Sequence, residues 1–187
     1  MDHVPSALSA WESFYVIVGS SGGALIGLQF VVITLIAGRR TLATAAALSA
    51  FGTPTVVHLT GALLVSAIMS APWPSLSSLA LVLGTCGFGG LVYGAIVIRR
   101  ALRQTDYEPV WQDWLWYIAL PCLSYAVLTV TAALLRAYPQ RSLFVIAGIA
   151  LGLLLIGIHN AWDTVTHIVV SSAGTGDNDA SSEAQPK

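Results

Sequence analysis

Five long apolar stretches constrain this chain more than any other feature of its sequence. The first carries no charged residue from position 14 to position 38 and ends at an arginine pair. About twenty apolar residues in a helix are enough to cross a hydrocarbon core of ~30 Å. We therefore predict an all-α membrane bundle of five transmembrane helices, at about residues 14–38, 50–71, 76–98, 114–135 and 143–170.

Composition supports the same class and excludes others. Hydrophobic residues make up 56% of the chain and charged residues 9%, whereas ordinary soluble domains have about 25% charged residues. Lipid must therefore cover most of the surface, and we expect one transmembrane domain at residues 1–170. The polar segment 171–187 has no apolar periodicity and is predicted to be a disordered tail. The net charge is -1 and the basic residues form no stripe along the sequence, which argues against nucleic acid as a partner.

The positive charges predict the orientation of the five helices. Five crossings put the termini on opposite sides, and the basic residues then divide six against two. The majority side contains Arg39, Arg40, Arg99, Arg100, Arg103 and Lys187, and the other side contains Arg136 and Arg141. Because positive residues accumulate in cytoplasmic loops, we expect the amino terminus outside and the carboxyl terminus in the cytoplasm.

Glycines recur at a spacing of four residues in three of the apolar stretches. Such small-residue ridges let helix backbones approach closely in lipid. We interpret them as packing surfaces inside the bundle, with self-association as the alternative. The glycines concerned are Gly19, Gly23, Gly27, Gly90, Gly94, Gly148 and Gly152.

One polar segment interrupts the end of the last apolar stretch. His159, Asp163 and His167 follow one another at intervals of four residues, so on a helix they lie along one side. Gly152, His159 and Asp163 fall within ~40° on a helical wheel. This predicts that Asp163 points into the bundle and away from lipid, where an aspartate is costly.

Two further polar residues are predicted at a similar depth. At a rise of ~1.5 Å per residue, Gln29, His58 and His159 lie roughly 21–24 Å from the outer surface. Pro54 precedes His58 by one turn, and Pro121 interrupts the fourth stretch. Both prolines are candidates for helix breaks, which often accompany sites in membrane proteins.

Three interpretations of this polar cluster stay open. The first is a hydrogen-bonded clamp, including Asn160, that locks the fifth helix to the first two. The second is an ion or proton pathway through His58, His159 and Asp163, because intramembrane ionisable groups are often functional. The third is a metal site. It is limited because His159 and His167 are roughly 12 Å apart on a helix, too far to share one ion.

Enzyme motifs are absent from the sequence. It contains no HExxH, nucleophile elbow or phosphate-binding glycine loop, and no second carboxylate accompanies Asp163 within an apolar stretch. We therefore expect a non-enzymatic membrane protein without a cofactor, which acts through helix–helix association with itself or with a membrane partner. The alternative is a small proton or cation channel or transporter.

Two short segments carry a resemblance. Residues 11–31 contain Trp-Glu-Ser-Phe-Tyr and then Ala-Leu-Ile-Gly-Leu-Gln-Phe-Val, and residues 157–163 read Gly-Ile-His-Asn-Ala-Trp-Asp. These segments resemble the first and last spans of a group of small uncharacterised bacterial multi-pass membrane proteins, some of which are labelled modulators of FtsH protease. That group commonly has leucine where Gln29 stands and arginine at the place of His159. The resemblance implies a location in the bacterial inner membrane.

Overall fold

A computed structural model describes residues 8–37, 53–101 and 111–183 of the chain. Side chains are described within these limits except at residues 35–37, 53, 100–101, 112–113 and 167–183. Several residues used to predict orientation, including Arg39, Arg40, Arg103 and Lys187, lie outside the described residues, as does the expected start of the second helix at 50–52.

The prediction of an all-α fold is confirmed, because the described residues contain helices and no strand. The elements are α2 (Glu12–Ala37), α4 (Thr53–Ser70), α5 (Leu76–Ala101), α6 (Trp111–Trp114), a π-helix η2 (Leu115–Ala119), α7 (Leu120–Leu134) and α8 (Pro139–Glu183).

Four of the helices are long and apolar enough to cross a membrane. The qualifying segments are Glu12–Thr34, Leu76–Arg99, Leu115–Leu134 and Pro139–Thr166. The apolar part of α4, Pro54–Ser70, is shorter. The length and composition of the four segments indicate a multi-pass membrane protein.

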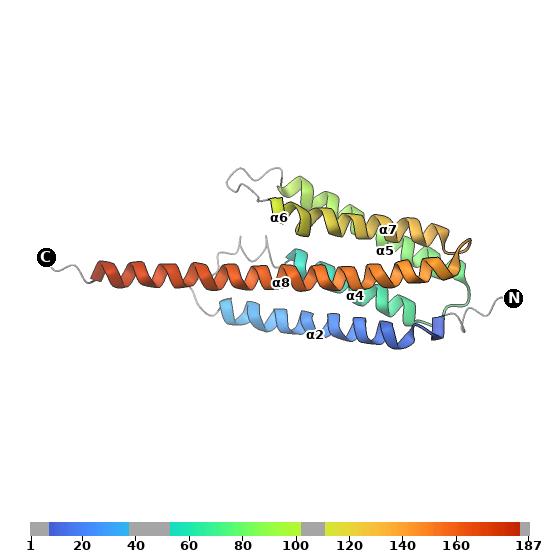
Figure 1. Cartoon of the computed structure of the whole chain (residues 1–187), viewed down its shortest axis with the longest axis horizontal. Coiled ribbons are helices and arrows are strands. Elements are labelled where there is room, and N and C mark those ends of the chain that lie inside the picture. Colours follow the sequence, from blue (N-terminus) through green and yellow to red (C-terminus); the bar gives the residue numbers. More distant parts are fainter. Residues whose placement is uncertain (1–7, 38–52, 102–110, 184–187) are drawn as a thin grey trace.

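The helix α8 differs from the sequence prediction at its carboxyl end. It continues to Glu183, whereas the sequence predicts a disordered tail from residue 171. Each residue added to an existing helix forms one more backbone hydrogen bond, so extension is far cheaper than nucleation. In Figure 1 this part of α8 extends beyond the ends of the other helices. Residues 184–187 lie outside the described part.

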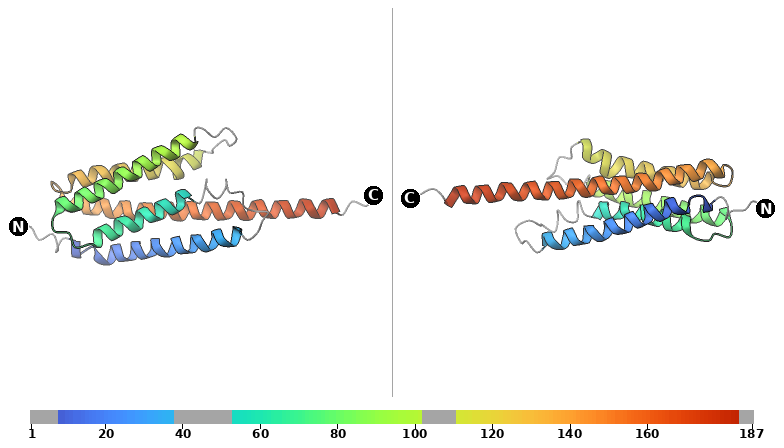
Figure 2. Two further views of the ribbon diagram at one scale, coloured as in Figure 1. Left: turned by 180° about the vertical axis from the view of Figure 1, so that it is seen from behind. Right: turned by 60° about the horizontal axis from the view of Figure 1, so that its bottom comes forward.

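The helices form a layered bundle with α4 and α8 at its centre. α4 packs between α2 and α8, and α7 packs against both α5 and α8. Figures 1 and 2 show α2 on one side of the bundle and α5 with α7 on the other. The start of α2, the α4–α5 connection and the α7–α8 turn all lie at one end of the molecule.

The buried seams follow the helical period rather than a strict spacing of four. On α8, residues at alternating intervals of three and four are buried, namely Leu143, Ile146, Ala150, Leu153, Gly157 and Asn160. A spacing of four residues drifts by about 40° per step on a helix with 3.6 residues per turn. A ridge at that spacing therefore leaves the packed face after one or two steps.

This drift corrects part of the glycine prediction. On α2, Gly19 packs against α4, and a Cβ atom there would lie 3.0 Å from the Ser66 Cβ. Gly22 also packs against α4, whereas Gly23 and Gly27 have no non-local atom of the described chain within 4 Å of the Cβ position. Gly148 and Gly152 on α8 are equally open within the described residues, and Gly157 is the α8 glycine that packs against Leu59. Gly90 and Gly94 do pack, against Tyr125 and Cys122 of α7.

Candidate functional site

Tyr125 joins three helices in the middle of the bundle. Its side chain comes from α7 and is only 3% exposed. A Cβ atom at Gly90 of α5 would overlap the ring carbons, and one at Gly61 of α4 would lie 2.6 Å from the hydroxyl. Only glycine at both positions leaves room for this tyrosine, so the two glycines and Tyr125 form a fitted slot.

His58 lies beside the Tyr125 hydroxyl. The imidazole is 2% exposed, and its Nδ1 is 3.4 Å from the hydroxyl oxygen. The tyrosine donates this hydrogen bond when Nδ1 carries no proton. The other ring nitrogen, Nε2, has no hydrogen-bond partner within the described part of the chain. His58 is therefore a buried core histidine with one unused polar atom.

The second polar centre lies where α8 meets η2, and Pro121 explains its shape. In a π-helix each N–H bonds to the carbonyl five residues earlier, as Leu120 N–H does to the Leu115 carbonyl. The carbonyl of Trp116 would pair with residue 121 in that register, and proline has no N–H to give. Instead the Nδ2 of Asn160 lies 3.5 Å from the Trp116 carbonyl oxygen and donates to it.

Two further contacts, both made by the Tyr117 hydroxyl, tie α8 to η2 around the same asparagine, and a third hydrogen bond lies within α8. The Tyr117 hydroxyl lies 3.4 Å from the Asn160 carbonyl oxygen and 3.3 Å from Oδ2 of Asp163. Thr164 donates from Oγ1 to the Asn160 carbonyl oxygen at 2.8 Å. Asn160 is fully buried, and its Oδ1 has no partner among the described residues. We call Asn160, Trp116, Tyr117, Asp163 and Thr164 the α8–η2 clamp.

The predicted orientation of Asp163 is wrong. Asp163 and His159 are both exposed, and the buried residue of this segment is Asn160. The prediction used Gly152 as a marker of the packed face, but no residue in the described part of the chain packs against the Cβ position of that glycine. His159 stacks on the Trp116 ring instead, with centroids 3.8 Å apart and planes at 21°.

The structure does not gather the predicted polar residues into one site. Gln29 of α2 is 5% exposed and His58 is buried in α4, whereas His159 and Asp163 lie on the surface of α8. The side chain of His167 is outside the described residues. Within the described part, no group of three histidine, cysteine or acidic residues could hold a metal ion. The α8–η2 clamp also differs from the predicted one in its partner. It joins α8 to the start of the fourth predicted span, whereas the sequence predicted a clamp to the first and second spans.

Three of the residues at these polar centres were not predicted from the sequence, namely Trp116, Tyr117 and Tyr125. Pro121 is a local signal for the first two, since a helix broken by proline leaves carbonyls that need donors. Tyr125 had no local signal, because its slot is made by glycines on two other helices.

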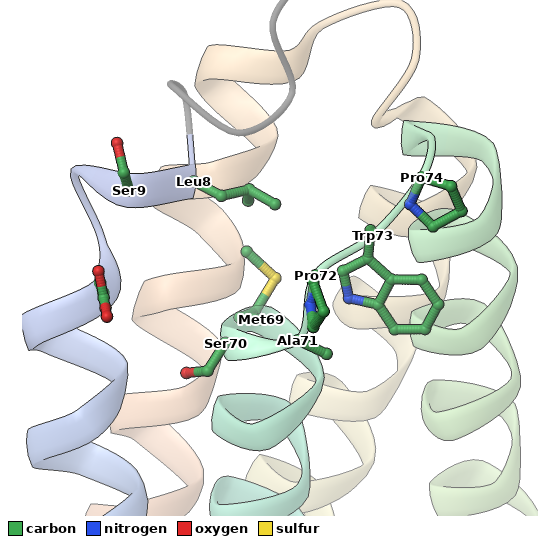
Figure 3. Close-up of a pocket in the computed structure, with 9 residues that line it drawn as sticks. Leu8, Ser9, Met69, Ser70, Ala71, Pro72, Trp73 and Pro74 are labelled. Carbon is green, nitrogen blue, oxygen red and sulfur yellow. The ribbon is translucent and has the colours of Figure 1, made fainter.

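A pocket of about 370 Å³ lies at the opposite end from the clamp. Figure 3 shows it between the start of α2 and the α4–α5 connection, with Met69 and Trp73 among its lining residues. Trp73 donates from its indole nitrogen to the Ile68 carbonyl oxygen at 2.6 Å. Glu12 is the one ionisable residue among the described residues that line it, so the pocket has no second group for acid–base chemistry.

Comparisons with protein-family models, curated proteins and solved structures give no match to this chain.

Proposed function

We propose that this chain is a five-span protein of the cell inner membrane that acts by helix–helix association and catalyses no reaction. Its amino terminus would lie outside and its carboxyl terminus in the cytoplasm, as the distribution of arginines predicts. The central position of α4 supports a fifth crossing. Its 18 residues span ~27 Å, close to the ~30 Å of a hydrocarbon core, and it is enclosed by α2 and α8.

The observation that carries this proposal is the open glycine face of α2. Among the described residues, Gly23 and Gly27 have no non-local atom within 4 Å of their Cβ positions. Leu28 and Val31 beside them are 60% and 54% exposed. In lipid, helices associate where small residues let backbones approach closely, because the burial of apolar surface provides no driving force when the surrounding lipid is equally apolar. The α2 face is thus available to a second copy of the chain or to a larger membrane protein.

Disulfide cross-linking tests the α2 face directly. In a background where Cys86 and Cys122 are replaced by alanine, Gly27→Cys should form a covalent dimer under mild oxidation in the membrane. Two such cysteines cross-link only when their Cα atoms approach to about 4.4–6.8 Å. Gly89→Cys on α5 is the matched control, because Gly89 is equally open but lies on another helix. It should form no covalent dimer.

The outcomes separate the two kinds of partner. A dimer from Gly27→Cys alone supports self-association through α2. A cross-link from Gly27→Cys to a different membrane protein supports a heterologous partner. Equal cross-linking from both positions, or none from either, contradicts association through this face.

Proton or cation conduction is a second candidate, supported by unused polar atoms inside the bundle. The hydroxyls of Tyr15 and Ser66, Nε2 of His58 and Oδ1 of Asn160 are buried with no partner among the described residues. Buried polar atoms of this kind commonly bind water, and a water chain can carry protons. The observation shifts the candidate path from Asp163, on the surface, to His58 in the core.

Proton flux into liposomes containing the purified protein tests this candidate. The native protein should conduct, His58→Gln should lose the flux, and Asp163→Asn should keep it because that carboxylate is exposed. A native protein that conducts neither protons nor cations would eliminate this function.

A further inference from the structure

A groove between α5 and α7 is separate from every site described above. It has a volume of about 560 Å³, within the range of ~300–1,000 Å³ typical of ligand sites. Its α5 wall includes Leu81 and Phe88, and its α7 wall includes Ala133. Figures 1 and 2 place α5 and α7 on the opposite side of the bundle from α2. The groove is therefore independent of the proposed association face.

The floor of the groove is narrow and apolar. Gly84 and Ala132 form it where the helices touch, since a Cβ on Gly84 would lie 3.7 Å from that of Ala132. Thr85 and Thr129 also line the groove, but each donates its hydroxyl to a backbone carbonyl one turn earlier, at 2.8 Å. Their donors are thereby satisfied within their own helices. The groove has the character of a slot for a hydrocarbon chain.

One end of the groove carries a positive charge. Arg136 lies two residues after the end of α7 and is the one charged residue among the described residues that line the groove. Its side chain is exposed. It lies two residues beyond the apolar segment Leu115–Leu134, at the level where lipid headgroups begin. From there the groove extends to Thr129, ~10 Å along α7 at ~1.5 Å per residue.

We propose that this groove binds an anionic phospholipid, with the headgroup phosphate on Arg136 and one acyl chain between α5 and α7. A guanidinium binds phosphate through paired, charge-assisted hydrogen bonds. An apolar slot that runs inward from the headgroup level suits a chain attached to that phosphate. A free phosphate would bind the arginine but leave the apolar slot empty. A partner helix would fill the slot but supply no anion for the arginine.

Native mass spectrometry of the detergent-solubilised protein tests the site. The probes are phosphatidylglycerol and phosphatidylcholine with identical acyl chains. The native protein should bind phosphatidylglycerol about 10-fold more tightly, equivalent to ~1.4 kcal/mol. Arg136→Gln should abolish this preference. Arg141→Gln should keep it, because it removes an equal charge nearby from a residue outside the groove.

Two further measurements distinguish the contributions of the chain and the phosphate. Ala133→Phe should weaken the binding of both lipids by filling the slot, with helicity unchanged by circular dichroism. Inorganic phosphate at the same concentration should not displace phosphatidylglycerol. Equal binding of the two lipids by the native protein, a preference that survives Arg136→Gln, or displacement by inorganic phosphate would each overturn the proposal.

Discussion

Replacing Gly61 with alanine tests the Tyr125 slot at atomic detail. The new Cβ would lie 2.6 Å from the tyrosine hydroxyl, and the next ring atom, Cζ, would be 3.5 Å away. An ordinary contact needs at least 3.4 Å, so the hydroxyl must retreat by about 0.8 Å, and overpacking of this kind typically costs ~1–3 kcal/mol. The gain of up to ~1 kcal/mol from helix propensity offsets part of this. We expect a net loss of about 1–2 kcal/mol in the free energy of unfolding.

The same geometry predicts a rescue by Tyr125→Phe. That change removes the oxygen and leaves Cζ at 3.5 Å, so alanine at position 61 then meets only an ordinary contact. Tyr125→Phe alone loses the hydrogen bond to His58, worth ~0.6–1.7 kcal/mol in a membrane protein. In its presence Gly61→Ala should cost nothing, or stabilise by up to ~1 kcal/mol. The coupling energy between the two substitutions should therefore be about 2 kcal/mol.

Gly90→Ala is the matched control for this cycle. Its Cβ would meet the ring carbons of Tyr125 rather than the hydroxyl, so Tyr125→Phe should not rescue it. Reversible unfolding in mixed micelles, followed by circular dichroism, measures all of the variants. Effects of Gly61→Ala and Tyr125→Phe that add within ~0.5 kcal/mol, or equal rescue of Gly90→Ala, would refute the slot.

Three other predictions follow from the contacts described above and can be tested by the same unfolding assay. Asn160→Ala should lower the free energy of unfolding by ~1 kcal/mol. The loss should be smaller in a Pro121→Ala background, because residue 121 then has an N–H that can bond to the Trp116 carbonyl in place of Asn160. Equal losses in the two backgrounds would contradict the clamp. Gly157→Ala should destabilise by ~1–3 kcal/mol through overpacking, whereas Gly148→Ala, in open space, should stabilise by ~0.5–1 kcal/mol; the reverse order would show that the seam of α8 is misplaced. Asp163→Asn should change stability by less than ~0.5 kcal/mol because the carboxylate is exposed, and a larger loss would place it inside the bundle.

The helices themselves were predictable because their signal is local. A long apolar run has to satisfy its backbone hydrogen bonds internally in lipid, which leaves helix as the solution for this composition. The structure has helices at all five predicted apolar stretches, although α4 has a shorter apolar segment than the other four. The orientation of the bundle and the number of crossings remain predictions.

The facing of each helix was harder to predict, because spacing alone does not identify the packed side. Gly23 and Gly27 fit a four-residue ridge with Gly19, but of the three only Gly19 packs against a neighbouring helix within the described residues. The seam instead continues through Gly22, three residues on. Asn160, rather than His159, is buried for the same reason. Choosing the packed face one residue away from its true position rotates a helix by ~100°. For this reason the site expected in the core at His159 and Asp163 lies on the surface.

The two polar centres depend on contacts between distant parts of the chain. The Tyr125 slot needs glycines on α4 and α5, and the clamp needs Asn160 opposite a carbonyl released before Pro121. The sequence shows each of these residues but not their pairing. Pro121 alone could have indicated that a backbone carbonyl before it needs a hydrogen-bond donor. The polar residues at the end of α8 include side chains that can donate.

The number of chains per complex tests the central claim of association most directly. The protein, carrying one fluorophore per chain, can be placed in lipid vesicles at low density and counted by photobleaching steps. Self-association through α2 predicts two or more steps for the native protein and for Gly89→Leu, and a single step for Gly27→Leu. A single step for the native protein at every density, together with no other protein recovered after gentle solubilisation, would contradict association as the function of this chain.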